Sequence, residues 1–490
     1  MTSTEKSIPK NERNRDIGPN GRRGMGSEKS AMKPESGKPV SLKLGSVKTE
    51  SLLGRVLPWA AKGGFALTDQ ALISGSNFVI SILLARWLTA DQYGAYAVAF
   101  GIFVLLTVLY QSLLLEPMAV FGGSSYRDNL REYLRILLWA HLALSAVICA
   151  VLGCWAALAR GMDPASALPA ALAGVTIASP LVLLFWLARR TFYLELSPAH
   201  AAVGALSYCA FAMGGLFLAR HWGVISPFWA FLSIALAALV TSCLLLRHLV
   251  ANLQPKTAAL HFGAVCRKHW SYGRWALIAN VASWVPAYLF YPLLSAFTGL
   301  AASGQLKALM NLVAPLQQTQ AALGMLFLPY AARLQGERAG QNAASLNRKI
   351  TVITLAGATS YWAVILWFKG PVFHLLYSGR YLEVAHYLPF VALGSILWAA
   401  AFGPTVVLRA MEAPRLVFLA YAIATVLSLI IGIPATKAFG LWGAILGVNL
   451  SDAVSLILMV VLLKRRLGEP SAKSETGGDS EVEPALIAMD

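Results

Sequence analysis

The chain has 490 residues, of which 57% are hydrophobic and only 13% are charged, against roughly 25% charged in an ordinary soluble domain. This composition excludes a soluble globular protein and indicates an integral membrane protein. The formal net charge of +17 comes from basic loops and a basic amino-terminal segment, so we expect no nucleic-acid partner.

Residues 1 to about 50 form a polar segment with eleven Lys and Arg and six acidic residues among Ser, Gly, Asn and Pro. Such a composition cannot bury enough apolar surface to fold, and it lacks the apolar core of a secretory signal, so no cleavage is expected. Residues 52–59 then predict a short interfacial helix. We interpret residues 1–57 as a disordered cytoplasmic arm that includes this interfacial segment. The arm either contacts anionic lipid or docks a cytosolic partner.

Twelve apolar segments follow, each near the roughly 20 residues that cross a bilayer. They are predicted at about 65–88, 93–115, 134–159, 166–188, 199–219, 225–246, 275–297, 304–328, 350–368, 386–408, 416–436 and 441–463. The first contains the polar cluster Ser74 to Asn77, and small polar residues inside a span normally face other helices. We therefore predict an all-α membrane protein with about 12 transmembrane helices packed as a bundle.

The two halves of the chain resemble each other. Gly94 and Gly304 correspond at an offset of 210 residues, as do Leu83-Leu84 and Leu293-Leu294. Six spans per half is an even number, so the halves would share one orientation, as parallel repeats do. We predict two six-helix lobes around a central cavity. The expected parts are an N-terminal lobe at 58–250, a cytoplasmic inter-lobe loop at 251–274, a C-terminal lobe at 275–466 and a disordered cytoplasmic tail at 467–490.

Lys and Arg indicate the orientation of the spans. The loops after even-numbered spans, with the tail, carry nineteen of these residues, and the odd-numbered loops carry six. The six are Arg86, Arg160, Arg220, Lys369, Arg380 and Lys437. The positive-inside rule then places both termini in the cytoplasm of a multi-pass protein.

Three stretches resemble the polysaccharide exporter branch of the multidrug/oligosaccharidyl-lipid/polysaccharide (MOP) flippase superfamily. The first is the run from Ser76 to Tyr96, the second is Glu116-Pro117, and the third is the block from Gly299 to Pro329. The resemblance covers roughly residues 60–465. It implies a flippase of the bacterial inner membrane that moves a lipid-pyrophosphate-linked oligosaccharide by alternating access, for exopolysaccharide, O-antigen or capsule assembly. It also implies a polysaccharide polymerase and a chain-length regulator as partners.

Lipid II flippases of the same superfamily are similar to this chain in two prolines of span eight, Pro315 and Pro329. They carry an arginine five residues before the first proline, where this chain has Met310, with Lys307 one turn earlier. This departure weakens an assignment to lipid II and leaves a cation on nearly the same helical face.

Ionisable residues within spans are costly, so each needs a reason. Asp452 shares one helical face with Asn449 and Ser455, and either a proton or sodium site or an interhelical hydrogen bond would explain it. Lys307 either snorkels to the interface or meets the cargo pyrophosphate that the resemblance implies.

Other polar and aromatic residues extend the set of candidates. Span seven carries aromatic residues beside two prolines, which predict a bent or broken helix with ring faces for sugars or with belt and core roles. The substrate and cavity candidates are Lys307, Arg86, Asn77, Trp284, Tyr288, Tyr291 and Asn311. The ion-coupling or gate candidates are Asp452, Asn449, Asp69 and Glu116. The alternatives are a headgroup anchor for Arg86, an interfacial position beside the basic loops for Asp69, and a helix-end position paired with a neighbouring Arg for Glu116.

Three classes of function are open at this point: the flippase, a cation-coupled multidrug antiporter of the same superfamily, and a membrane-bound sugar polymerase or acyltransferase. The sequence shows no nucleophile elbow, phosphate-binding loop or metal-ligand pattern. The longest internal loop, about 247–274, has no acidic residue, which disfavours an enzyme. We therefore expect no catalytic residue, no metal and no cofactor, and transport driven by a gradient or by a partner.

Overall fold

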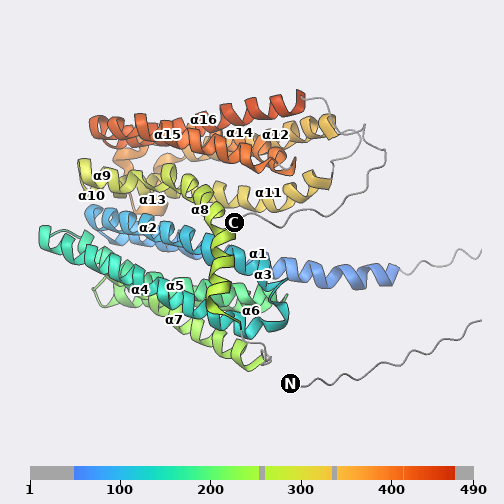
Figure 1. Cartoon of the computed structure of the whole chain (residues 1–490). Coiled ribbons are helices and arrows are strands. Elements are labelled where there is room, and N and C mark those ends of the chain that lie inside the picture. The colour runs from blue at the N-terminus through green and yellow to red at the C-terminus, as the bar shows by residue number, and fades with distance from the viewer. Residues whose placement is uncertain (1–48, 253–259, 334–338, 412, 469–490) are drawn as a thin grey trace, which may run out of the picture. The chain divides into compact units, whose positions relative to one another are not determined.

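The computed structural model describes residues 49–252, 260–333, 339–411 and 413–468 (Figure 1). Most of the predicted disordered arm, 1–48, and of the predicted tail, 469–490, lies outside the described residues. The chain divides into a unit of residues 1–55 and a unit of residues 56–490. The helical bundle belongs to the second unit.

All regular structure of the described residues is helical, which confirms the predicted all-α fold. The helices are α1 Thr49–Trp87, α2 Ala90–Tyr110, α3 Glu116–Gly122, α4 Leu130–Met162, α5 Leu168–Leu194, α6 Pro198–His221, α7 Pro227–Asn252, α8 Phe262–Tyr288, α9 Phe290–Thr298, α10 Leu300–Asn311, α11 Ala314–Arg333, α12 Ala339–Trp367, α13 Lys369–Tyr377, α14 Leu388–Ala410, α15 Pro414–Phe439 and α16 Leu441–Gly468. A π-helix, η1 Gln111–Leu115, joins α2 to α3, and two short 3₁₀ helices are η2 Arg127–Asn129 and η3 Leu382–Tyr387.

Within the described ranges, eleven helical segments are long and apolar enough to cross a membrane. The eighth predicted span, 304–328, is the exception, because α10 ends at Asn311 and α11 begins at Ala314. This region is also rich in polar side chains, and a segment of that kind lines a cavity more readily than it faces lipid. Its polar residues are Gln305, Lys307, Asn311, Gln317, Gln318, Thr319 and Gln320.

Span seven is interrupted as predicted. α8 contains Pro286 and ends at Tyr288, Leu289 separates it from α9, and α9 continues to Thr298. The expected inter-lobe loop at 251–274 is shorter than predicted, because residues 262–274 already belong to α8. The expected interfacial helix at 52–59 is likewise continuous with the first span in α1.

The two lobes repeat one pattern of helix packing, which supports parallel repeats. In the N-terminal lobe, α5 packs against α4 and α7, and α7 also packs against α6. In the C-terminal lobe, α14 packs against α12 and α16, and α16 also packs against α15. These are the corresponding spans three to six and nine to twelve, so the predicted two-lobe architecture is confirmed.

Helix α8 packs against the N-terminal lobe although it follows that lobe in the chain. It contacts η1, α2, α3 and α4, as well as α15 and α16 of the C-terminal lobe, and Figure 1 shows it running steeply across the neighbouring helices. The π-helix provides the contact surface: His269 Nδ1 lies 3.0 Å from the carbonyl oxygen of Leu113, and Asn280 Nδ2 donates to Ser112 Oγ at 3.0 Å. A Cβ at Gly273 would lie 2.6 Å from the carbonyl oxygen of Ser112, so glycine permits this approach.

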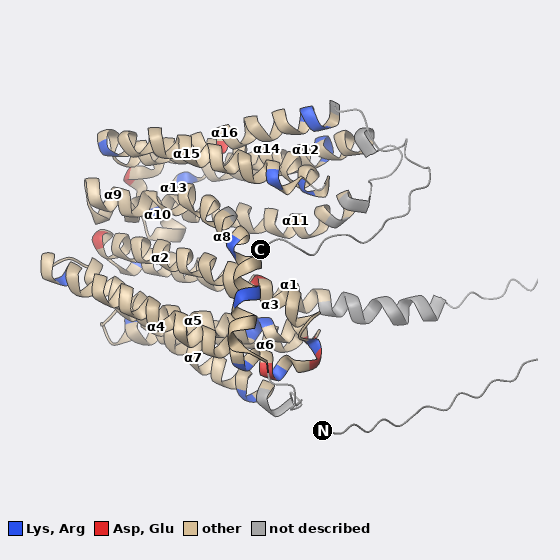
Figure 2. Ribbon diagram, viewed as in Figure 1, with Lys and Arg blue, Asp and Glu red and all other residues tan. Residues whose placement is uncertain are grey.

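The charge asymmetry leads to a first prediction, on topology. Figure 2 shows the described Lys and Arg residues mainly near helix ends, with long uncharged stretches between them. Reporter fusions after Arg160 and Lys437 are expected to read as periplasmic, and fusions after Arg190 and Lys349 as cytoplasmic, because basic loops are retained inside. Alkaline phosphatase and green fluorescent protein activities measure this. A reversed reading at any of the four sites would contradict the orientation.

Candidate functional site: a polar cavity between the lobes

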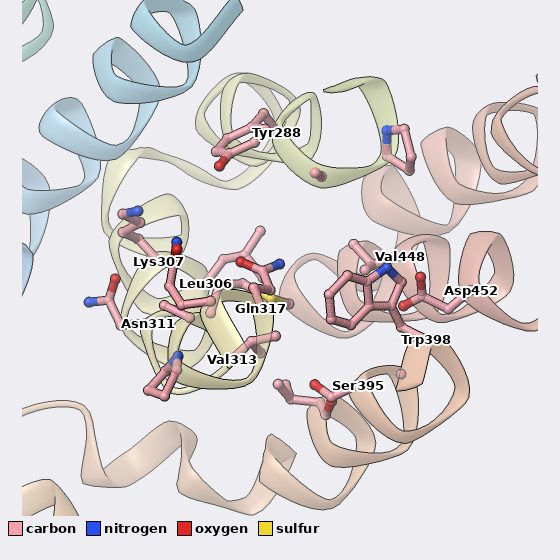
Figure 3. A pocket seen from close by; sticks show the side chains of 18 of the residues that line it. Tyr288, Leu306, Lys307, Asn311, Val313, Gln317, Ser395, Trp398, Val448 and Asp452 are labelled. Atoms are coloured by element: carbon pink, nitrogen blue, oxygen red, sulfur yellow. The ribbon is translucent and has the colours of Figure 1, made fainter. Parts of the chain in front are cut away.

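A cavity of about 740 Å³ lies mainly within the C-terminal lobe and opens against α1 and α2 of the N-terminal lobe. Its walls come from α1, α2, α8, α9, α10, α11, α14, α15 and α16. Seven predicted site residues line it: Asn77, Tyr288, Tyr291, Lys307, Asn311, Asn449 and Asp452. Figure 3 shows Lys307 and Asn311 on one wall and Trp398 and Asp452 on another. A volume of this size is in the usual range for a site that binds a small molecule or a headgroup.

Exposure along the cavity decreases from one end to the other. We call the side where α1 ends and α2 begins the outer side, since the charge bias predicts it to be periplasmic, and the opposite side the inner side. Asn77, Gln317 and Gln318, toward the inner side, are exposed, whereas Lys307 and Asn311, toward the outer side, are buried. Since all five line the cavity, solvent reaches it from the inner side.

Lys307 extends from α10 toward the N-terminal lobe. Its Nζ lies 4.2 Å from the centroid of the Phe100 ring on α2, a cation–π contact that holds the ammonium group across the lobe boundary. The residue is 9% exposed and lines the cavity. A desolvated cation in such a wall is a strong contact for a negatively charged group.

Asp452 and Asn449 form a polar pair on α16 beside a glycine of α14. Asn449 Nδ2 donates to the carbonyl oxygen of Phe390 at 2.9 Å, which fixes the amide. A Cβ at Gly394 would lie 2.2 Å from Asn449 Oδ1 and 3.3 Å from Asp452 Oδ2. Glycine at position 394 therefore makes the space in which these two oxygen-bearing side chains lie together, an arrangement suited to a proton or a hard cation.

The outer end of the cavity is closed by a hydrogen-bonded cluster that joins the two lobes. Ser81 Oγ lies 3.0 Å from Tyr93 Oη and donates to Asn311 Oδ1 at 3.0 Å, while Asn311 Nδ2 donates to Tyr93 Oη at 2.9 Å. All three side chains are buried. We call Ser81, Tyr93 and Asn311 the closure cluster.

Two glycines bring the lobes into close contact beyond this cluster. A Cβ at Gly94 would lie 1.7 Å from the carbonyl oxygen of Leu300, and a Cβ at Gly304 would lie 3.0 Å from the Gly94 nitrogen. Gly94 and Gly304 are the residues that correspond in the two halves of the sequence. Small residues at matching positions let the two equivalent helices, α2 and α10, approach closely.

Two arginines on the outer side each donate a hydrogen bond to a backbone carbonyl of the other lobe. Arg86 at the end of α1 donates to the carbonyl oxygen of Leu375 at 2.6 Å, and Arg380 donates to the carbonyl oxygen of Leu88. Each guanidinium group thus bonds a helix-terminal carbonyl of the other lobe. Tyr381 adds a ring contact to Tyr93, at 5.9 Å between centroids, and burial raises the pKa of Tyr381 to about 12, so its hydroxyl stays neutral.

Four predicted site residues do not line the cavity. Arg86 takes part in the outer contact just described. Trp284 Nε1 donates to the carbonyl oxygen of Gly101 at 3.1 Å, and its ring stacks on Tyr288, which does line the cavity.

The other two lie near the inner side in separate contacts. Asp69 is 1% exposed, is hydrogen-bonded by Tyr193 and lies 3.6 Å from Arg189 Nε, so it joins α1 to α5 within the N-terminal lobe. Glu116 accepts a long hydrogen bond, 3.4 Å, from Asn280 of α8.

The sequence did not indicate several residues of the cavity wall. Arg409 lines the cavity at the end of α14, but a basic residue at the end of a span is ordinarily explained by the adjoining loop. Gln317, Gln318 and Trp398 also line it. The only available signal was the run Gln317-Gln318-Thr319-Gln320 inside an otherwise apolar segment.

No protein-family model matches the chain, and no curated protein matches it either. The fold, by contrast, matches solved structures over most of their length. A MATE-family multidrug resistance transporter of the MOP superfamily in an inward-facing conformation matches with a TM-score of 0.67 and 12% identity, over 82% of this chain and 98% of the other. The lipid II flippase MurJ, in an inward closed conformation, matches with a TM-score of 0.64 and 12% identity, over 84% of this chain and 87% of the other.

The eukaryotic MATE transporter AtDTX14 matches with a TM-score of 0.56 and 16% identity, over 84% and 98% of the two chains. At such identities these likenesses show the fold alone. The chain therefore has the fold shared by transporters and flippases of the MOP superfamily.

Proposed function

We propose that this chain is a flippase that moves a lipid-pyrophosphate-linked oligosaccharide repeat unit across the bacterial inner membrane for polysaccharide assembly. The observation that carries the proposal is the charge of the cavity wall. Its charged residues within the described ranges are two cations, Lys307 and Arg409, and one carboxylate, Asp452. Such a wall favours a cargo with negative charge.

The two cations lie at different depths in the wall. Arg409 is exposed on the inner side, at the end of α14, whereas Lys307 is buried near the outer end. A pyrophosphate entering from the inner side would meet Arg409 first and Lys307 after moving along the wall. Since exposed charges interact weakly and desolvated charges strongly, Lys307 supplies the stronger of the two contacts.

Asp452 is the proposed coupling residue. It lines the cavity that the cargo enters, and Gly394 keeps it beside Asn449. A carboxylate there takes up a proton or cation in one conformation and releases it in the other, which couples a gradient to the movement of the lobes.

The cross-lobe contacts support alternating access. The closure cluster, the Gly94 contact and the two arginine bonds close the outer side, while polar residues of the inner half are exposed. The structure is therefore proposed to be the inward-facing state that loads cargo in the cytoplasmic leaflet. A polysaccharide polymerase and a chain-length regulator would use the cargo after it crosses, with both termini of the flippase in the cytoplasm.

A cation-coupled multidrug antiporter is the second candidate, favoured by one arrangement. Asp452, Tyr421 and Trp398 all line the cavity, and a carboxylate beside aromatic rings suits an organic cation. The fold is equally that of MATE transporters.

Reconstitution separates the two candidates, and this is our second prediction. In proteoliposomes, the chain is expected to move undecaprenyl-pyrophosphate-linked oligosaccharide from one leaflet to the other and to leave ethidium untransported, because two cations line the route. Access of an impermeant glycosidase to the sugar measures the first, and ethidium fluorescence the second. Gradient-driven ethidium movement without lipid movement would support the antiporter instead.

A further inference from the structure

The inner half of the cavity has a wall of neutral polar side chains that neither charge recognition nor ion coupling uses. Ser74 and Asn77 come from α1, and Gln317 and Gln318 come from α11. We call these four residues the amide strip. Ser74 Oγ donates to Gln318 Oε1 at 3.0 Å, across the two lobes, and itself accepts from Gln70 Nε2 at 3.1 Å.

The amide strip is available to a ligand. Asn77, Gln317 and Gln318 are exposed and line the cavity. Within the described residues, the side-chain amides of Asn77 and Gln317 have no hydrogen-bond partner, although each carries two donor hydrogens and an acceptor oxygen. Amides at membrane depth are expensive unless they face water or cargo, so this wall is shaped for a polar ligand.

An aromatic ring on the neighbouring helix completes the wall. Trp398 lies on α14, which packs against α11, and it lines the same cavity (Figure 3). The ring is half-buried, and it has no hydrogen bond and no aromatic partner among the described residues. An indole with an accessible face beside amides presents an apolar platform and several donors and acceptors together.

We infer that the amide strip and Trp398 form a subsite for the uncharged sugar part of the cargo, separate from the cationic contact at Lys307. A sugar ring has hydroxyls that both donate and accept hydrogen bonds and an apolar face of C–H groups, which the amides and the indole match respectively. Lys307 lies on α10 and is buried near the outer end, whereas Gln317 lies on α11 and is exposed toward the inner side, so the two contacts are assigned to different parts of the cargo. The inference rests on the proposed function, because it assumes a glycosylated lipid.

Pyrophosphate alone is a poor occupant of this subsite. The four residues of the amide strip carry no charge, and a pyrophosphate gains most from cations and oriented N–H groups. An organic cation is also a poor occupant, because amide donors at Asn77 and Gln317 would remain unpaired beside it, which costs affinity. Hydroxylated rings are the class that satisfies both the amides and the indole.

The test compares two lipids on the purified full-length chain in detergent micelles. The probes are undecaprenyl pyrophosphate and the same lipid carrying a disaccharide, and the measurement is the dissociation constant from titrations followed by thermal unfolding. We expect both lipids to bind the wild type, with the glycosylated lipid bound about tenfold more tightly, as one or two net hydrogen bonds would give. In the double variant Gln317→Met/Gln318→Met this difference is lost, while undecaprenyl pyrophosphate binds as before.

Gln320→Met is the matched control. Gln320 lies on the same helix and is 4% exposed, but it does not line the cavity, so its variant should keep the tenfold difference. Equal binding of the two lipids to the wild type, or a double variant that keeps the preference, would overturn the sugar subsite. If neither lipid binds, the proposed function fails instead, so the two failures are distinguishable.

Discussion

Lys307→Ala is expected to reduce polysaccharide production strongly in a strain that lacks its own copy of the gene, with the protein present in the membrane at the wild-type level. Lys307 is buried, lines the cavity and is held by Phe100. A charge-assisted contact there is worth about 1.5–3 kcal/mol, so removal should lower the rate of transport about tenfold to more than a hundredfold. Immunoblots and quantified cell-surface polysaccharide measure the two quantities.

Two further substitutions refine this result. Lys307→Arg keeps the charge and should retain part of the activity, although the planar group does not replace a compact ammonium. Lys349→Ala removes an exposed lysine of α12 that is outside the cavity and should have no effect. Full complementation by Lys307→Ala would show that this lysine has a structural role only.

Asp452→Asn belongs to the same experiment because it addresses coupling rather than cargo binding. The amide keeps the size and polarity of the side chain and removes its ability to gain and lose a proton. Transport driven by a gradient should stop, while binding of the pyrophosphate lipid at Lys307 should persist. A variant that is missing from the membrane would instead show that Asp452 holds α16 in place.

Gly94→Ala is expected to prevent closure of the outer side, and this is the second large effect. The added Cβ would lie 1.7 Å from the carbonyl oxygen of Leu300, a distance that no pair of such atoms tolerates, and backbone atoms cannot move aside as a flexible side chain does. A penalty of about 1–3 kcal/mol would shift the equilibrium between the two states by roughly tenfold to a hundredfold. The state with a closed outer side would be depopulated by that factor, and transport would fall with it.

The change of state can be measured directly. Met310 lines the cavity, and a Met310→Cys variant in a background without the five native cysteines reports access from outside. An impermeant maleimide added to whole cells should label it several-fold faster when Gly94→Ala is present. Gly153→Ala is the control, since a Cβ at Gly153 meets nothing within 4 Å. Unchanged labelling together with full transport would show that α2 and α10 need not touch.

Much of the fold was predictable because exposing polar groups to lipid costs a large free energy. Membrane spans therefore appear in the sequence as long apolar runs. Eleven spans follow from these runs, whereas the interruption of span seven was predicted from its prolines. Span eight departs from the pattern because some of its polar side chains are not exposed to lipid. Gln317, Gln318 and Lys307 line the cavity, so the polar residues that make the segment functional also lower its hydropathy.

The candidate site was only partly predictable, because a sequence does not show which side chains of different helices share a space. Asp452 and Lys307 stood out as single charges in apolar spans, and both line the cavity. Arg409 could not be separated from the basic loop that follows it. Arg86 was equally compatible with a gate and with a lipid anchor, and its bond to the carbonyl oxygen of Leu375 could be found only once the lobes were placed together.

The π-helix in span two makes the residues before it and the residues after it face different neighbouring helices. Each residue of an α-helix advances the chain by about 100° around the axis, and the wider turn at Gln111–Leu115 offsets everything after it by a step of this order. The first part of the span can thus direct Gly94 toward α10, while the last part directs Ser112 and Glu116 toward α8. A single helical wheel drawn for the whole segment would therefore place these two surfaces wrongly. The parts before and after the π-helix each need a separate helical wheel.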